Sequence, residues 1–145
     1  HHQPYKNTVC IRSGNKSAVK QLLGDCAMIN GLVGVIVWTE NFDGMVEFYC
    51  KNLGFTPHSV RSNFVSFKWD GVRLGIGKHS EVRGSTIEPN RIMINFGVND
   101  IRKECGILRD AGVIIIREPE KEHWGGWVAT LLDPDGNTIQ LLQHP

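Results

Sequence analysis

Residues 32–55 read LVGVIVWTENFDGMVEFYCKNLGF, and this stretch decides the fold. The β-branched run at its start has the composition and length of one strand. A helix is predicted at 41–51, because apolar residues recur there at helical spacing and Asn41 is a suitable N-cap. Gly54 then supplies a stop for the helix. The stretch therefore predicts a strand followed by an amphipathic helix.

Three further strands complete this first unit. They are predicted at 56–61, 64–69 and 72–79. Asp70-Gly71 joins the last two strands and is the typical signal of a two-residue type I′ hairpin turn. The order of elements is strand, helix and three strands.

The same order occurs a second time, at an offset of about 60 residues. Its predicted elements are a strand at 91–98, a helix at 99–111 and strands at 113–116, 127–132 and 138–143. An internal duplication of this kind predicts two tandem βαβββ modules, 31–80 and 91–143. We expect an α+β domain whose two sheets combine into one curved, half-open mixed β-barrel.

The first thirty residues differ from the rest of the chain. They begin with His1-His2, which resembles the remnant of a purification tag, and they contain one short helical pattern at 15–24. We therefore predict an N-terminal extension, 1–30, with one appended helix. Three roles are possible for this helix: it covers an edge of the core, it acts as a lid, or it contacts a second copy of the chain.

Composition excludes several classes of function. The chain has 145 residues, which is the size of one domain, and a formal net charge of +1 with basic and acidic residues interleaved. Nucleic-acid binding is not expected, since phosphate contacts require a concentrated surplus of Lys and Arg. No apolar run approaches the roughly 18 residues that a membrane span needs. We expect a soluble, cytoplasmic protein with no nucleic-acid or membrane partner.

The four cysteines are widely spaced and form no CxxC motif. Such spacing suits neither a disulfide framework nor a zinc cluster. We expect ordinary reduced thiols at Cys10, Cys26, Cys50 and Cys105.

Two stretches carry a family resemblance. The first is Asn41-Phe42 with Phe48-Tyr49 and Leu53-Gly54-Phe55, and the second runs from Trp124-Gly125-Gly126 through Asp133-Pro134-Asp135-Gly136-Asn137 to Leu141. In this order and spacing they resemble the two modules of the glyoxalase / bleomycin resistance protein / extradiol dioxygenase (vicinal oxygen chelate) superfamily. The resemblance covers 31–143 and implies the glyoxalase/bleomycin resistance fold.

The resemblance also implies where a divalent metal would be held, on the first and last strand of each module. Those positions in this chain are Gly34, Gly75, Met93 and Gln140. Glycine has no side-chain ligand and a thioether is too soft for Mg²⁺ or Mn²⁺, so only Gln140 offers a suitable oxygen. We therefore predict no metal and no cofactor, as in the branch of the family that contains antibiotic-binding resistance proteins.

Alternation along the strands separates two faces of the predicted sheet. Across the Asp70-Gly71 turn, Trp69 pairs with Val72, and both are assigned to the core with the apolar positions further along these strands. The concave face receives four strand glycines, Gly34, Gly75, Gly77 and Gly97, which indicate either bulges and tight coiling or a pocket enlarged for a bulky ligand.

The candidate ligand-binding residues lie on this concave face or at its mouth. A carboxylate, phosphate or phenolate ligand would relieve the repulsion between Lys68 and Arg73, which are predicted to be directly opposite one another. Trp124 and Trp127 bracket Gly125-Gly126 and suit a ligand clamp or an aromatic cap on the barrel. The full set is Trp38, Phe42, Lys68, Arg73, His79, Met93, Asn95, Trp124, Trp127 and Gln140.

Three hypotheses of function follow. The leading one is a metal-independent small-molecule binding protein, a homodimer that sequesters a bulky aromatic or anionic compound such as an antibiotic. The alternative is a metal-dependent or metal-free lyase, isomerase or dioxygenase-like enzyme of the same superfamily, with His79 or His123 acting with Gln140. His123 is the best candidate for a general base, although no catalytic residue is assigned. The third is an interaction module that uses the N-terminal helix.

Overall fold

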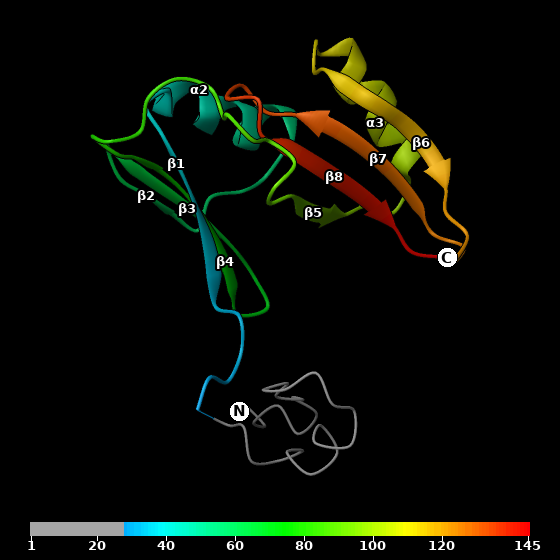
Figure 1. The fold of residues 1–145 in the computed structure, drawn as a ribbon, viewed down its shortest axis with the longest axis horizontal. Helices are drawn as coiled ribbons and strands as arrows, with labels where there is room; N and C mark the ends of the chain where they lie inside the picture. Colours follow the sequence, from blue (N-terminus) through cyan, green and yellow to red (C-terminus); the bar gives the residue numbers. More distant parts are fainter. Residues whose placement is uncertain (1–27) are drawn as a thin grey trace. The chain divides into compact units, whose positions relative to one another are not determined.

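The computed structural model describes residues 28–145 and contains two four-stranded sheets (Figure 1). The compact unit that carries the sheets is 35–145. The helix predicted at 15–24 lies outside the described residues. Within the described part, no helix is long and apolar enough to cross a membrane.

Sheet one has the strand order β1-β4-β3-β2. Its strands are β1 (Gly34–Thr39), β2 (Ser59–Val60), β3 (Phe64–Trp69) and β4 (Val72–Lys78), and its helical segment is α2 (Phe42–Glu47) continued by the π-helical turn η1 (Phe48–Asn52). Gly54, at a φ of 75°, allows the chain to leave the helix, and the Phe55 amide closes the turn on the Tyr49 carbonyl at 3.1 Å.

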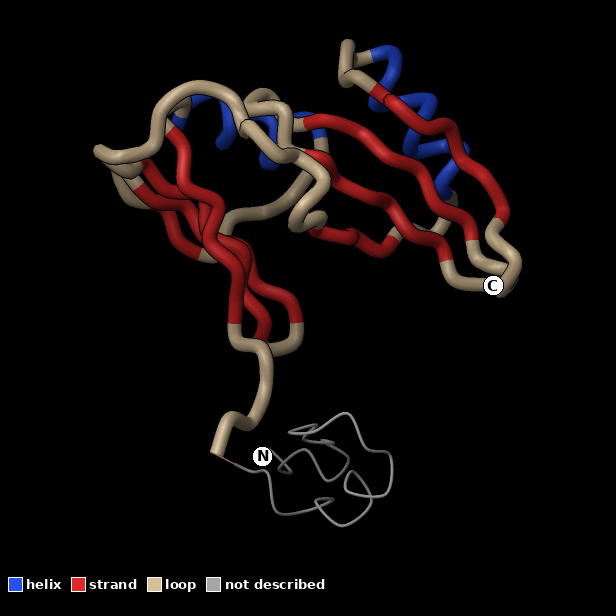
Figure 2. The backbone as a smooth tube through the Cα atoms, in the orientation of Figure 1, coloured by secondary structure: helices blue, strands red, loops and turns tan. Residues whose placement is uncertain are grey.

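Sheet two repeats this arrangement with the order β5-β8-β7-β6. It consists of β5 (Ile94–Gly97), β6 (Ile115–Lys121), β7 (Trp127–Leu132) and β8 (Thr138–Gln143), with α3 (Ile101–Asp110) packed against the last three of these strands (Figure 2). The two βαβββ modules are thus confirmed. The described strands do not join into one continuous barrel wall, because β1 and β5 are both edge strands.

The predicted hairpin register is confirmed residue by residue. Asp70 and Gly71 both have positive φ, and Trp69 pairs with Val72, Lys68 with Arg73 and Ser66 with Gly75. Val65 and Phe67 are buried as expected. The assignment of Trp69 to the core is wrong in part: its indole packs on Phe55 and Phe67 but stays 44% exposed, because it lies at the open end of the hairpin.

One core unites the two modules. Apolar side chains from both helices and both sheets share it, among them Met45, Phe67, Ile101, Leu131 and Ile139. Ile94 and Phe96 of β5 pack against it, as predicted. Burial also raises the pKa of the Cys50 and Cys105 thiols, which disfavours their reactive thiolate form.

A buried hydrogen bond links the helical segment of module one to the turn of module two. The Tyr49 hydroxyl donates to the Asp133 carboxylate at 2.8 Å. Asp133 also accepts hydrogen bonds from the Asp135 amide and from the backbone and side chain of Asn137. Burial, reinforced by the nearby Asp133 charge, raises the pKa of Tyr49 far above its usual range, so the phenol remains a donor. The Asp-Pro-Asp-Gly-Asn turn thus fixes one module to the other.

Replacing Tyr49 by Phe should lower the free energy of unfolding by about 1–2 kcal/mol, because a buried carboxylate loses one of its donors. Urea denaturation followed by circular dichroism measures this change. A double-mutant cycle with Asp133→Ala should give a coupling energy of similar size. Additive effects of the two substitutions would show that the hydrogen bond does not stabilise the fold.

Candidate functional site

The aromatic residues predicted for the concave face of sheet one gather into a cluster. The Trp38 ring lies edge-on to Phe64, with centroids 5.9 Å apart, and to His79, at 5.1 Å. Trp38 is 40% exposed, whereas Gly75 and Gly77 beneath the cluster are buried. The cluster therefore forms a rigid aromatic surface on this face.

Two of the strand glycines make room for this cluster. A Cβ built on Gly75 would stand 2.4 Å from the tip of the Phe64 ring, and one on Gly77 would stand 2.5 Å from the Trp38 ring. Such distances are far below van der Waals contact, so a side chain at either position would displace a ring. The chain's own aromatic rings, and not an added ligand, occupy the space that these two glycines leave.

Sheet two carries a cavity of about 440 Å³ on the corresponding face. We call it the sheet-two cavity, and it is lined by Asn90, Met93, Ile116, Arg117, Thr130, Thr138 and Gln140. Thr130 and Gln140 are direct cross-strand partners, which places their side chains next to one another. Met93 and Ile116 add apolar walls. The cavity combines hydrogen-bonding groups with a small apolar surface.

Arg117 is the cationic group of the sheet-two cavity. One of its terminal nitrogens donates to Glu122 at 2.8 Å and to Glu120 at 3.2 Å. These hydrogen bonds raise the pKa of the guanidinium, Glu122 contributing most. The carboxylates orient the side chain through a single nitrogen, Nη2, so the arrangement leaves its Nε and Nη1 hydrogens for an oxygen atom of a ligand.

The segment between the two modules borders the same cavity. Asn90 accepts a hydrogen bond from the Thr138 hydroxyl at 2.8 Å, and the Thr86 amide donates to the Asp135 carbonyl at 2.8 Å. A side-chain hydrogen bond between Thr86 and Asn137 adds a third tie. The connection is therefore fastened to the start of β8, which brings Asn90 to the cavity.

The structure brings together only part of the predicted set. Trp38 and His79 share the aromatic cluster, and Met93 and Gln140 share the sheet-two cavity. Arg73 and Asn95 line a different cavity at the end of the β3–β4 hairpin. Lys68 is exposed on β3 next to Arg73.

Three aromatic candidates lie away from these places. Phe42 packs against the core. Trp127 is on the α3 side of β7, where its ring is 4.5 Å from the Arg102 guanidinium carbon. Trp124 folds back on Gly126, so closely that a Cβ there would overlap the indole. Trp124 and Trp127 therefore do not form a common clamp in this structure.

The sequence reasoning missed Asn90, Ile116, Arg117 and Thr130. The predicted strand ended at 116, yet β6 continues to Lys121 with two shifts in register and carries Arg117. Thr130 could have been found by pairing β7 with β8 across the turn, as Leu131 pairs with Ile139. His123 lies exposed in the β6–β7 turn and does not line the sheet-two cavity.

The residues present do not fit the divalent metal that the family implies. Met93 and Gln140 do meet in one cavity, but Gly75 lies under Phe64 and has no ligand to offer. Across residues 28–145, no three His, Cys, Asp or Glu side chains come together as a metal-binding group. One amide oxygen and one thioether are an unsuitable donor set for a hard cation.

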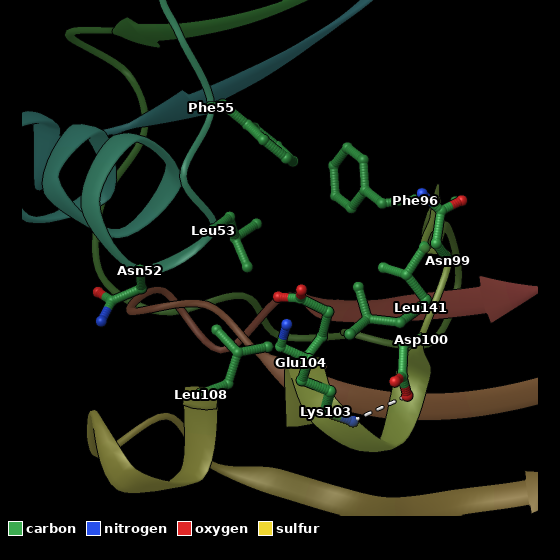
Figure 3. A pocket seen from close by; sticks show the side chains of 12 residues that line it. Asn52, Leu53, Phe55, Phe96, Asn99, Asp100, Lys103, Glu104, Leu108 and Leu141 are labelled. Carbon is green, nitrogen blue, oxygen red and sulfur yellow. Dashed lines mark hydrogen bonds between the residues drawn. The ribbon is translucent and has the colours of Figure 1, made fainter. Parts of the chain in front are cut away.

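A second cleft, of about 480 Å³, opens on the helix side, between the end of η1 and the start of α3 (Figure 3). Polar and apolar side chains both line it, and the Phe55 and Phe96 rings lie next to one another at its edge. The first amides of α3 are already used, since the Ile101 amide donates to Gln143 and the Lys103 amide to Asp100. The helix terminus therefore offers little to an anion here.

Substituting Gly77 by Ala should destabilise the fold by about 1–3 kcal/mol, because the new methyl group overlaps Trp38 and Phe64. Gly97→Ala is the matched control, since a Cβ there meets no atom within 4 Å. Thermal and urea unfolding of both variants measure the difference. Equal effects of the two substitutions would contradict the packing of the cluster on β4.

Comparisons with known proteins agree with this architecture. The family model described as Glyoxalase/Bleomycin resistance protein/Dioxygenase superfamily matches residues 31–141. The chain is 29% identical, over 77% of its length and 94% of the relative, to a probable lactoylglutathione lyase of Synechocystis sp.. It is 30% identical to a probable lactoylglutathione lyase of Vibrio cholerae, over 72% of this chain and 83% of that protein.

Solved structures show the same fold at lower identity. A glyoxalase/dioxygenase from Nostoc punctiforme superposes with a TM-score of 0.67 at 16% identity, covering 79% of this chain and 91% of that one. A glyoxalase-related enzyme from Fulvimarina pelagi gives a TM-score of 0.66 at 16% identity, covering 79% and 88%. With the paired βαβββ modules and the family match over most of its length, the chain belongs to the glyoxalase/bleomycin resistance protein/dioxygenase superfamily.

Proposed function

We propose that this protein binds a small molecule without a metal ion and that the sheet-two cavity is its binding site. The observation that carries the proposal is the donor set: the four positions implied for a metal hold Gly34, Gly75, Met93 and Gln140. An aromatic ring covers the Gly75 position in place of a ligand. We therefore interpret the face that holds a metal ion in the family's enzymes as an apolar and hydrogen-bonding surface in this chain.

The sheet-two cavity favours a ligand with an oxygen-rich head and an apolar body. Arg117, Gln140 and Thr130 supply hydrogen bonds to the head, and Met93 and Ile116 contact the body. Its volume of about 440 Å³ lies within the range of known small-molecule sites, about 300–1,000 Å³. Sequestration of a bulky aromatic or anionic compound, such as an antibiotic, is the activity that we propose for such a site.

An enzyme on the same scaffold is the second candidate. The names of the relatives favour it, because two of them are described as probable lactoylglutathione lyases. Cleavage or formation of lactoylglutathione is therefore the reaction to assay. It would require either a metal held through other residues or a histidine, His79 or His123, as the acid–base group, with the Gln140 amide as a hydrogen-bonding partner of the substrate.

Metal titration separates the two candidates. Thermal melts with Ni²⁺, Zn²⁺, Mn²⁺ or Mg²⁺ at millimolar concentration should show no specific stabilisation, since binding to the folded state alone would raise the melting temperature. The same samples are assayed for turnover of lactoylglutathione. A shift that Gln140→Ala abolishes, together with turnover, would replace the binding proposal by the enzyme.

Tryptophan fluorescence tests ligand binding directly. A panel of antibiotics and aromatic carboxylates should include a compound that quenches the wild-type emission, and Arg117→Gln should weaken its binding about tenfold through loss of a charged hydrogen bond. Arg83→Gln is the control, because Arg83 is exposed in the connecting segment and does not line the cavity. Equal loss in both variants would argue against a site at Arg117.

We further propose that the protein forms a homodimer through the β1 edge of sheet one, on the face that carries Ile36 and Trp38. The outer edges are protected: β2 has two residues, and β6 carries Pro119, shifts in register and alternating charges. The edge strand β1, in contrast, exposes 51% of Ile36 and 40% of Trp38. A second copy of the chain is the partner that we propose for this apolar edge, because an uncovered sheet edge is open to pairing with another chain.

Sedimentation velocity tests the dimer. Wild-type protein should sediment as a dimer at micromolar concentration, and Ile36→Lys should convert it to a monomer. Val60→Lys, on the opposite edge of the same sheet and 70% exposed, should leave the dimer intact. A wild-type monomer, or dissociation by Val60→Lys alone, would refute this interface.

A further inference from the structure

A third hollow, of about 430 Å³, lies between the end of the β3–β4 hairpin and β5. We call it the hairpin cavity; it is lined by Val35, Phe55, Trp69, Val72, Arg73, Leu74, Ile94, Asn95, Phe96 and Gly97. Four consecutive residues of β5 border it, so it runs along that strand's free edge. It shares no lining residue with the sheet-two cavity.

Three aromatic rings form the apolar wall of the hairpin cavity. The Phe55 centroid is 5.0 Å from that of Trp69 and 4.9 Å from that of Phe96, at steep interplanar angles. Figure 3 shows the Phe55 and Phe96 rings next to one another. Trp69 and Phe96 complete the triangle at 6.2 Å. These mutual edge contacts hold the rings in place before any ligand arrives.

The Trp69 side chain is 44% exposed, although its indole packs against the rings of Phe55 and Phe96. Burial of aromatic surface away from water is favourable, in proportion to the area covered. A fixed, half-exposed indole beside an apolar hollow is therefore a surface that an aromatic ligand would cover favourably. Among residues 28–145, packing covers only part of the Trp69 ring.

The polar lining adds a charge requirement. Of the described residues that line the cavity, only Arg73 and Asn95 have polar side chains. Arg73 lies directly across the strand pair from Lys68. In the part of the chain that the structure describes, neither of these two cations has an acidic partner. An anionic group near Arg73 would relieve this like-charge pairing.

We propose that the hairpin cavity is a second binding site, for a small planar aromatic acid. The aromatic ring packs against Trp69, Phe55 and Phe96, and the acidic group pairs with Arg73. Two fused rings with one carboxylate suit its volume of about 430 Å³. This site is separate from the sheet-two cavity, so a ligand here does not depend on the function proposed above.

Calorimetric titration with 2-naphthoate and with the uncharged 2-naphthylmethanol tests the site. Naphthoate should bind the wild type more tightly than the alcohol does. Arg73→Gln should weaken naphthoate about tenfold, the size of one charge-assisted hydrogen bond, and leave the alcohol unchanged. Trp69→Ala should weaken both compounds, and Trp69→Phe should retain most of the affinity for both.

Arg61→Gln is the matched control. It removes the same charge at the other end of β3, next to Phe64, and should leave naphthoate binding unchanged. If Arg61→Gln and Arg73→Gln weaken naphthoate binding equally, the loss of net positive charge explains the weakening without a contact at Arg73, and the proposal is overturned. No naphthoate binding by wild-type protein would overturn it as well.

The two sites fail in different ways. Loss of naphthoate binding in Gln140→Ala, with Arg73→Gln unaffected, would place the probe in the sheet-two cavity and overturn only the second site. Thermal melts of each variant establish that it is folded. If Trp69→Ala does not fold, the comparison of Arg73→Gln with Arg61→Gln decides the outcome.

Discussion

The hydrogen bond from Tyr49 to Asp133 is the interaction on which the arrangement of the modules depends. Each βαβββ unit is small, and neither helix alone can cover its sheet and also close the shared core. Burial raises the pKa of Asp133, and the hydrogen bonds that Asn137 and Tyr49 donate to its carboxylate oppose this effect only in part. The turn is held tightly, and β8 therefore starts from a defined place beside the connecting segment that carries Asn90.

The two concave faces have diverged although the modules share one pattern. On sheet one, glycines admit Phe64 and Trp38 against the strand backbone, and the face becomes a rigid aromatic surface. On sheet two, Thr130 and Gln140 leave a hollow that Arg117 borders. A hydrogen-bonding hollow at one module and aromatic rings at the other differ from the four-ligand metal site that the resemblance implies.

Local patterns were sufficient for the fold. The Asp70-Gly71 turn fixed the register of β3 and β4, because a two-residue turn allows only one pairing of its flanking strands. The longer turn before β8 allowed several pairings, so Thr130 was not assigned. The apolar run at 113–116 predicted only the first part of β6. The strand continues through Pro119, because an edge strand has one free side and tolerates a proline there, and this places Arg117 at the sheet-two cavity. The alternation of side chains along β3 predicts which side of the sheet Trp69 faces. It does not predict that this end of the hairpin extends past the core and leaves the indole partly exposed.

By itself, the sequence determined the two modules, the hairpin register, the alternation of faces and the lack of a suitable metal ligand at three of the four implied positions, Gly34, Gly75 and Met93. These features depend on chemistry that acts between near neighbours in the chain. Tertiary structure alone decided which side chains share a cavity: Asn90 with Gln140, Arg73 with Phe96, and Trp38 over Gly77. Each of these contacts joins residues from different strands or modules, and their distance depends on packing that no local pattern records.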